Sequence, residues 1–279
     1  MITPLDDPRV EIARQTIGAV RIVADPGLPP HLLRLLDARG KTYVAKRHTQ
    51  RDRYTREVHA YRTWGHHLRG YVPELVGWQD STHTMLLTGL PGDSGDRVPL
   101  GSAEEEQAHH VAGFVLGALH RTTALGPTGA IGAELAQRVR DWITRADRAD
   151  LISSTERGCL LRYADALANT IVAGAVCHLD YQPRNWLVRE EVFGVCDFEH
   201  MRRDARIRDF TRLEFRHWQA RPRLRDAFFD GYGARLTGTE QQLLESFGAI
   251  EAITAIVRGH EQGDVTLSAH GRTVLARLP

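Results

Sequence analysis

The sequence predicts an α+β fold built from two lobes, a small mainly β N-terminal lobe and a larger mainly α C-terminal lobe. Apolar runs of strand length recur between residues 18 and 88, and turn signals such as Asp25-Pro26-Gly27 separate them. Beyond residue 104 the apolar residues recur at helical spacing instead. Pro91-Gly92-Asp93 breaks the chain between the two patterns. We therefore expect an N-terminal lobe over residues 1–90 and a C-terminal lobe over residues 91–279.

Four apolar runs are the predicted strands of the N-terminal lobe. They read VRIV, LLRLL, TYVAK and TMLLT, at residues 20–23, 32–36, 42–46 and 84–88. One helix, over residues 51–64, interrupts them, because Tyr54, Val58 and Tyr61 recur at positions i, i+4 and i+7.

Glu57 lies on the same stripe of this helix, three residues after Tyr54. A carboxylate on a buried face needs a cationic partner, because an unpaired buried charge costs several kcal/mol. Lys46, at the end of the preceding strand, is the nearest candidate. The alternative is a solvated Glu57 at the edge of the helix.

Lysine is rare in this chain, which has Lys41 and Lys46 against 34 arginines. A lysine that remains in such a composition is expected where arginine cannot replace it, for example where a compact point charge meets a phosphate. The three cysteines show no CxxC spacing, so the sequence predicts neither a zinc site nor a disulfide framework.

The overall charge and hydropathy point to a cytoplasmic protein, a monomer or weak dimer. A formal net charge of +1 gives no overall field toward nucleic acid or an anionic membrane, so we expect neither as a partner. The N-terminus lacks a basic region followed by an apolar stretch, and the longest run of small apolar residues covers only residues 171–177.

The C-terminal lobe is predicted to be helical around one island of strands. Helical patterns cover residues 104–123, 138–145, 156–170 and most of the chain after residue 224. The island, residues 175–196, contains WLV and VFGVC on either side of Glu190-Glu191, which predicts an antiparallel hairpin. Folding the chain at this turn brings Asn185 and Asp197 side by side at the open end of the hairpin.

The residues around this hairpin predict a site for phosphoryl transfer. One amide oxygen and one carboxylate suffice to hold Mg²⁺, because the ion takes water and phosphate oxygens as its other ligands. Asp180 lies five residues before Asn185 and is placed to accept a hydrogen bond from an attacking hydroxyl group. Taken alone, Asp180 and Asn185 would be better explained as turn formers and Asp197 as a solvated strand end. The joint pattern HxDxxxxN, hairpin and DFE is much more specific, with His178 expected to brace the loop.

These motifs resemble, in order, those of the aminoglycoside phosphotransferase and choline kinase superfamily, which has a protein-kinase-like fold. The matching segments are VAK with the helical glutamate, LLTGLPG, HLDYQPRN and DFE, over about residues 43–209. The resemblance implies that ATP or GTP binds with Mg²⁺ in the N-terminal, nucleotide-binding lobe. It also implies that the C-terminal lobe holds the catalytic and acceptor sites.

The resemblance assigns roles to single residues. Lys46 would hold the α- and β-phosphates, and Glu57 would orient Lys46. Thr88 and Leu90, in LLTGLPG, would hydrogen-bond the adenine edge with their backbone. Asp180 would be the catalytic base, and the two residues that bind Mg²⁺ would be Asn185 and Asp197.

Two features depart from the pattern of the superfamily. The segment that precedes Lys46 reads DPGLPP and lacks the glycine-rich loop that covers phosphates in kinases. The third residue of DFE is Glu199 rather than glycine, and we expect Glu199 to take part in the acceptor site.

Charge counts along the chain suggest an acceptor. Residues 202–225 hold nine arginines against three acidic residues, whereas residues 240–264 hold five acidic residues against Arg258. Either run is most often a solvated helix face. If the second run lines the acceptor pocket, Glu251 and its neighbours form an acidic wall that favours a small cationic acceptor such as an aminoglycoside or a basic cyclic peptide antibiotic. The alternatives are a metabolic kinase for an amino alcohol, sugar or amino acid, and an inactive nucleotide-binding module.

Overall fold

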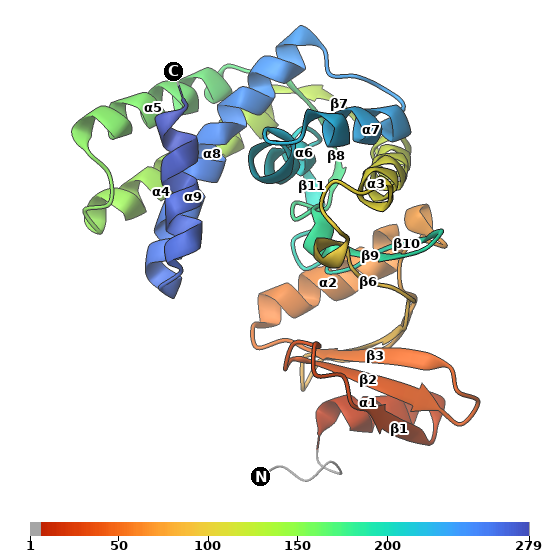
Figure 1. Cartoon of the computed structure of the whole chain (residues 1–279). Helices are drawn as coiled ribbons and strands as arrows, with labels where there is room; N and C mark the ends of the chain where they lie inside the picture. Colours follow the sequence, from red (N-terminus) through yellow and green to blue (C-terminus); the bar gives the residue numbers. More distant parts are fainter. Residues whose placement is uncertain (1–6, 279) are drawn as a thin grey trace.

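The computed structural model describes residues 7–278 and shows a small sheet-containing lobe below a larger helical lobe (Figure 1). The N-terminal sheet is antiparallel, with the strand order β1-β2-β3-β5-β4. Its strands are β1 (Val20–Val23), β2 (Leu32–Asp37), β3 (Thr42–Arg47), β4 (Leu75–Gln79) and β5 (Thr84–Thr88). The predicted α+β fold is confirmed, and the four strands predicted in this lobe are present.

The two faces of β3 have different chemistry because side chains alternate along a strand. Tyr43 and Ala45 pack with Ala13 of helix α1 (Pro8–Ile17) in a small apolar cluster. Lys46 points to the opposite face, where helix α2 (Arg51–Trp64) lies. Helix α1 was not predicted from the sequence.

Helix α2 begins and ends at the predicted residues and buries the predicted stripe. Tyr54, Val58 and Tyr61 belong to the main apolar core. Glu57 lies on that stripe and is 1% exposed. The alternative of a solvated Glu57 is therefore wrong, and its carboxylate needs the partners described below.

The C-terminal lobe consists of helices that pack in pairs, α3 with α7, α4 with α5 and α8 with α9. The helices are α3 (Ala103–Thr122), α4 (Gly129–Arg148), α5 (Ser154–Ala168), α6 (Arg208–Leu213), α7 (Pro222–Tyr232), α8 (Gly238–Gln262) and α9 (Val265–Ala276). None of the helices within residues 7–278 has the length and hydropathy that a membrane span requires.

Two small antiparallel sheets carry the loops of the site. One has the order β10-β9-β6, with β6 (Asp93–Ser94), β9 (Trp186–Arg189) and β10 (Val192–Val195). The other has the order β11-β8-β7, with β7 (Leu125–Thr128), β8 (Val172–Cys177) and β11 (Arg202–Ala205). In the β9–β10 hairpin Arg189 pairs with Val192 and Trp186 with Val195, the register predicted from the sequence.

The arginine-rich run after residue 201 is not one helix face. Its first four residues form β11, which pairs with β8. The run then continues through α6, a π-helical turn at Glu214–Trp218 and α7. Its arginines therefore project from several elements rather than along one solvated surface.

Close contact between α3 and α7 yields a stability prediction. A side-chain carbon at Gly113 of α3 would collide with the carbonyl oxygen of Phe228 in α7. We expect Gly113→Ala to lower the free energy of unfolding by about 1–3 kcal/mol in urea titrations followed by circular dichroism. The control is Gly158→Ala on α5, where a side-chain carbon would meet nothing within 4 Å. It should raise stability by about 0.5–1 kcal/mol, and equal effects of both changes would contradict the close packing.

Candidate active site

Three charged side chains from three elements meet between the lobes. Lys46 Nζ lies 2.7 Å from Glu57 Oε2 on α2 and 2.6 Å from Asp197 Oδ1, which follows β10. Lys46 is 6% exposed. The predicted ion pair between Lys46 and Glu57 is present, and Asp197 joins it from the C-terminal lobe.

Burial and pairing oppose each other in this cluster. Burial alone would lower the pKa of Lys46, but the carboxylates of Glu57 and Asp197 outweigh it and raise the pKa above its usual value. Burial alone would raise the pKa of Glu57, yet the Lys46 ammonium group and then His48 lower it. The same ammonium group lowers the pKa of Asp197 against the effect of burial. All three groups are therefore charged at neutral pH.

Asp180 lies in the loop between β8 and β9, and hydrogen-bond donors surround its carboxylate. Arg184 Nη2 lies 2.7 Å from Oδ2, and Asn185 Nδ2 donates to the same oxygen at 2.9 Å. Gln182 and Arg212 contact the other oxygen, Oδ1. These contacts fix the orientation of a carboxylate that is 1% exposed.

Asn185 and Asp197 lie near the open end of the hairpin and keep one oxygen each for a cation. Asn185 uses Nδ2 to hold Asp180, and Asp197 uses Oδ1 to hold Lys46. Within residues 7–278, no hydrogen bond involves Asn185 Oδ1 or Asp197 Oδ2. Amide and carboxylate oxygens are the ligands that Mg²⁺ prefers, so these residues fit the predicted ion. That they share one ion stays a prediction.

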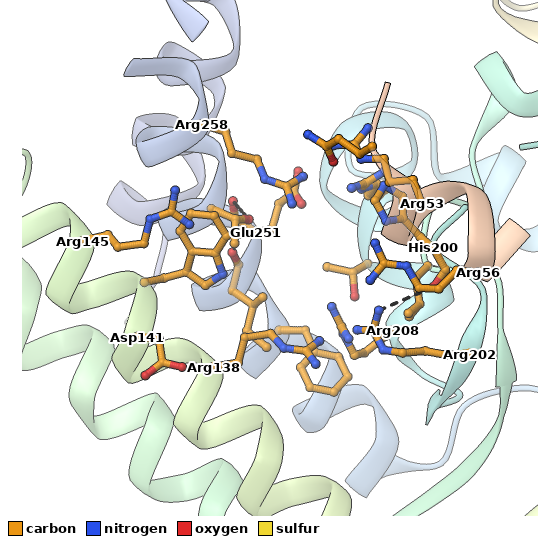
Figure 2. A pocket seen from close by; sticks show the side chains of 18 residues that line it. Arg53, Arg56, Arg138, Asp141, Arg145, His200, Arg202, Arg208, Glu251 and Arg258 are labelled. Atoms are coloured by element: carbon orange, nitrogen blue, oxygen red, sulfur yellow. Dashed lines mark hydrogen bonds between the residues drawn. The ribbon is translucent and has the colours of Figure 1, made fainter. Parts of the chain in front are cut away.

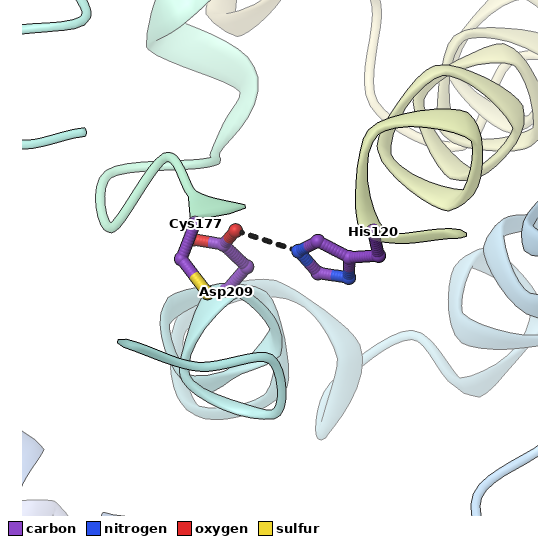
Figure 3. Close-up of side chains that lie close together, drawn as sticks. All are labelled: His120, Cys177 and Asp209. Carbon is purple, nitrogen blue, oxygen red and sulfur yellow. Dashed lines mark hydrogen bonds and ion pairs between the residues drawn. The ribbon is translucent and has the colours of Figure 1, made fainter. Parts of the chain in front are cut away.

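Asp209, at the start of α6, positions the loop that contains Asp180. Its two oxygens accept hydrogen bonds from the backbone N–H groups of His178, at 2.9 Å, and Leu179, at 2.5 Å. His120 of α3 contacts Asp209 Oδ2 through Nε2 at 3.1 Å (Figure 3). Leu179 has a left-handed φ of 64°, a conformation that costs about 1–3 kcal/mol and that these bonds hold in place. Sequence reasoning missed Asp209, which stands in a segment of mostly polar and charged residues that gave no signal for burial.

Cys177 lies beside His120 and Asp209, but the group is better explained as structure than as a metal site (Figure 3). Burial raises the pKa of the Cys177 thiol well above its usual value, so the thiolate that a metal needs is disfavoured. Asp209 is already committed to backbone donors, and His120 Nδ1 lies 3.0 Å from the Tyr232 hydroxyl.

His178 braces the loop as expected. Its Nδ1 accepts the backbone N–H of Asp180 at 3.2 Å, so Nε2 carries the proton and donates to the Cys196 carbonyl at 3.0 Å. Burial lowers the pKa of this imidazole, which agrees with the neutral form. His178 thereby ties the loop of Asp180 to the segment that carries Asp197.

The predicted nucleotide contacts lie where β5 ends. The Thr88 N–H donates to the Glu74 carbonyl at 2.9 Å, and the Gly89 N–H donates to the Thr42 carbonyl at 2.8 Å. The Leu90 N–H donates to no residue among those described, which leaves it available to a nucleotide base. The roles of Thr88 and Leu90 stay predictions.

Glu199 follows Asp197 and Phe198 and holds α2 from the other lobe. Its Oε1 lies 2.8 Å from Arg53 Nη1. His48 and His200 lie nearby, at 3.7 and 3.4 Å from its carboxylate oxygens. Glu199 lines the cavity that contains Asp180 and Asp197, and its predicted contact with the acceptor stays a prediction.

Two cavities adjoin at the loop that contains Leu179 and Asp180. One, of about 540 Å³, contains Asp180 and Asp197. The other, of about 660 Å³, opens between α2, α4, α6 and α8 (Figure 2). Six residues line both cavities, namely Arg53, His200, Arg212, Glu251, Thr254 and Arg258.

The expected acidic wall is wrong. Glu251 does lie beside both cavities, but Arg216 Nε and His270 Nε2 occupy its Oε1 at 2.6 and 3.0 Å. Two further acidic residues of the same helix also pair with arginines, Glu240 with Arg206 and Glu261 with Arg145. Two of these partners, Arg206 and Arg216, come from the arginine-rich run, and the lining of the cavity of about 660 Å³ keeps an excess of positive charge.

The fold and this site define a kinase-like phosphotransferase, with a buried lysine–carboxylate cluster facing an aspartate–asparagine pair across two lobes. Residues 31–244 match the phosphotransferase enzyme family. The chain therefore belongs to the phosphotransferase enzyme family, as the sequence resemblance indicated. No match to the sequence was found among the curated proteins.

Solved structures of phosphotransferases share this fold at low sequence identity. The gentamicin complex of aminoglycoside phosphotransferase APH(2'')-IIa is 17% identical with a TM-score of 0.69, and the match covers 100% of this chain and 98% of that chain. Its streptomycin–ATP ternary complex is 15% identical with a TM-score of 0.65, and the match covers 99% of this chain and 97% of that chain. Macrolide 2'-phosphotransferase MphH from Brachybacterium faecium is 17% identical with a TM-score of 0.63, and the match covers 93% of this chain and 92% of that chain.

The pairing of Glu251 yields a pH-dependent prediction. Burial would raise its pKa, but the hydrogen bond from His270 and the charge of Arg216 lower it to about 2. Because the folded-state pKa lies below the ordinary value of 4.5, the stabilisation is complete above about pH 4.5 and is lost as the pH falls toward 2.

We therefore expect Glu251→Gln to lower the free energy of unfolding by about 3 kcal/mol at pH 7, and by less at pH 3.5. Urea titrations of both proteins at the two pH values measure the difference. A penalty that is constant with pH, or that grows as the pH falls, would contradict a charged and buried Glu251.

Proposed function

We propose that this phosphotransferase transfers the γ-phosphoryl group of ATP or GTP to a hydroxyl group of a small molecule. The observation that carries the proposal is the convergence of Lys46, Glu57, Asp180, Asn185 and Asp197 from both lobes. An inactive module has no need for a strained, hydrogen-bonded loop that presents the Asp180 carboxylate to the same cavity as Asp197. The chemistry of phosphoryl transfer needs these groups together, because it depends on positioning and on neutralising charge.

The charged cluster supplies the contacts for the triphosphate. Lys46 is fixed by Glu57, so its ammonium group is held in place to meet α- and β-phosphate oxygens. Asn185 and Asp197 would hold Mg²⁺, which would supply positive charge to neutralise the negative charge that develops on the phosphates. Leu90 offers its free N–H to the base.

Asp180 accepts the proton of the attacking hydroxyl group. The bond between the acceptor oxygen and the γ-phosphorus forms as the bond to the ADP oxygen breaks, and the hydroxyl proton passes to the Asp180 carboxylate. The side chain of Arg184 is 53% exposed, so it can leave Oδ2 and make room for the hydroxyl. Asn185 and Gln182 keep the carboxylate oriented during this exchange.

The acceptor is not settled by the fold. Gentamicin and streptomycin occupy similar folds in other proteins, so antibiotics are one class of candidate acceptor, with a role in resistance. The expected cationic charge of the acceptor rested on an acidic wall that is absent here. A metabolic acceptor remains the alternative, and both classes belong in one screen of hydroxyl compounds.

We expect Asp180→Asn to lower kcat at least about a hundredfold, because positioned proton acceptance contributes on the order of 10² to 10⁴ in rate. ADP release with an acceptor from the screen measures kcat, and titration with MgATP measures nucleotide affinity, which should change little. The control is Asp226→Asn, a surface residue that pairs with Arg235. A kcat above about a tenth of the unmodified value would remove Asp180 from this role.

The two metal ligands should act on one ion. We expect Asn185→Ala and Asp197→Ala each to weaken magnesium-dependent ATP binding, and the double variant to add little further loss. Calorimetric titrations with ATP are made once in the presence of Mg²⁺ and once in the presence of EDTA. The difference gives the metal-dependent part of the ATP affinity. Fully additive losses would show two independent contributions and would contradict the shared site.

A further inference from the structure

Arginines dominate the larger of the two cavities. Eight of them line it against two carboxylates, Asp141 and Glu251, and Glu251 is already paired. Arg258, Arg53 and Arg208 project toward the same open space from different elements (Figure 2). The eight are Arg53, Arg56, Arg138, Arg145, Arg202, Arg208, Arg212 and Arg258.

The carboxylates around the cavity do not balance this charge. Asp204 Oδ2 alone serves three arginines, with Arg202 at 3.0 Å, Arg208 at 2.5 Å and Arg138 at 3.6 Å. Arg138 also pairs with Glu134 at 3.2 Å, so Asp204 is left to balance both Arg202 and Arg208 with one negative charge. Arg212 contacts Asp180, which already pairs with Arg184.

Two of the eight lining arginines, Arg56 and Arg258, have no acidic partner within residues 7–278. Arg56 is an exposed residue of α2 with no ion pair or hydrogen bond in the described part of the chain. Arg258 of α8 is partly buried, and its guanidinium group stacks over Trp142, 5.6 Å from the ring centroid. Arg145 stacks on the same ring at 4.0 Å. The indole therefore holds two guanidinium groups at one wall; Arg145 pairs with Glu261, whereas Arg258 has no carboxylate partner among the described residues.

This arrangement costs free energy in the absence of a ligand. Burial lowers the pKa values of Arg138, Arg202 and Arg258, and the charges of neighbouring arginines lower them further. Arginine nevertheless keeps its proton at neutral pH, so the repulsion persists. An anion in the cavity would remove it, and guanidinium groups are suited to bind carboxylate or phosphate with two hydrogen bonds.

The cavity lies where an acceptor must lie. Leu179, the residue before Asp180, lines it, and Arg212 extends from it to the Asp180 carboxylate. A volume of about 660 Å³ accommodates a small molecule. A molecule held by Arg56 and Arg258 therefore has the catalytic loop within the same connected space.

We propose that the acceptor is a hydroxyl compound that carries at least two anionic groups, phosphate or carboxylate, which the arginines of this cavity bind. The inference rests on the proposed function and names the chemical class of its acceptor. The arginines orient the anionic ends, and a hydroxyl group between them reaches Asp180.

Binding of matched probes to the full chain tests the proposal. Calorimetric titrations are made at saturating MgADP, so that the nucleotide site does not bind the probes. The anionic probes are fructose 1,6-bisphosphate and glucarate, their neutral analogues are fructose and sorbitol, and gentamicin is the cationic probe. The pocket variant combines Arg56→Gln with Arg258→Gln. Its control combines Arg14→Gln with Arg162→Gln, which removes two exposed charges outside the cavity.

We expect at least one anionic probe to bind at least about tenfold more tightly than its neutral analogue. Its affinity should fall at least about tenfold in the pocket variant and stay unchanged in the control. The two anionic probes distinguish phosphate from carboxylate recognition. The proposal is overturned if neither anion exceeds its analogue, if gentamicin binds more tightly than both, or if pocket and control variants lose affinity equally.

MgATP binding and Asp180-dependent ADP release are measured on the same preparation. Loss of both, with anion binding intact, would overturn the proposed function while leaving the anion site in place. Phosphoryl transfer to a cationic acceptor, without anion binding, would leave the proposed function standing and overturn the acceptor class.

Discussion

The buried ion cluster of Lys46, Glu57 and Asp197 is the interaction on which the order of the site depends. Each member comes from a different element, and none is stable in an apolar core without the others. A lysine on the inner face of β3 thus fixes where α2 packs and where the segment after β10 ends. Because His178 ties that segment to the loop of Asp180, the geometry of one lobe is transmitted to the other.

Local patterns predicted those parts of the site that short-range geometry determines. The period of two along a strand and a tight turn fixed the hairpin register, which placed Asn185 near Asp197. Helical spacing put Glu57 on a buried stripe, and electrostatics then required Lys46. The apolar runs of the hairpin end at a polar turn, and the helical stripe of α2 is regular, which explains why their bounds were predicted within a residue or two.

Other parts of the site depend on contacts between segments that are distant in the sequence. The sequence contains only weak signals for such contacts. Asp209 holds a loop 30 residues before it, and only the folded chain shows that its neighbours are backbone N–H groups. The prediction of an acidic wall was wrong for the same reason. Charge was counted along the sequence, whereas neutralisation takes place in space, where Arg216 reaches Glu251 from an element 35 residues away. The arginine-rich run supplied the partners and still had charge left for the cavity.

The contrast between the two cavities separates what the fold provides from what this chain adds. Proteins at 15–17% identity share this fold, so the arrangement of the lobes belongs to the fold. Acceptor choice belongs to the side chains that α2, α4, α6 and α8 direct into the neighbouring space. Arg258 is partly buried without an ion-pair partner within residues 7–278, and the neighbouring charges of Arg53 and Arg145 repel it. An uncompensated charge next to a catalytic loop is therefore best explained by a ligand that compensates it.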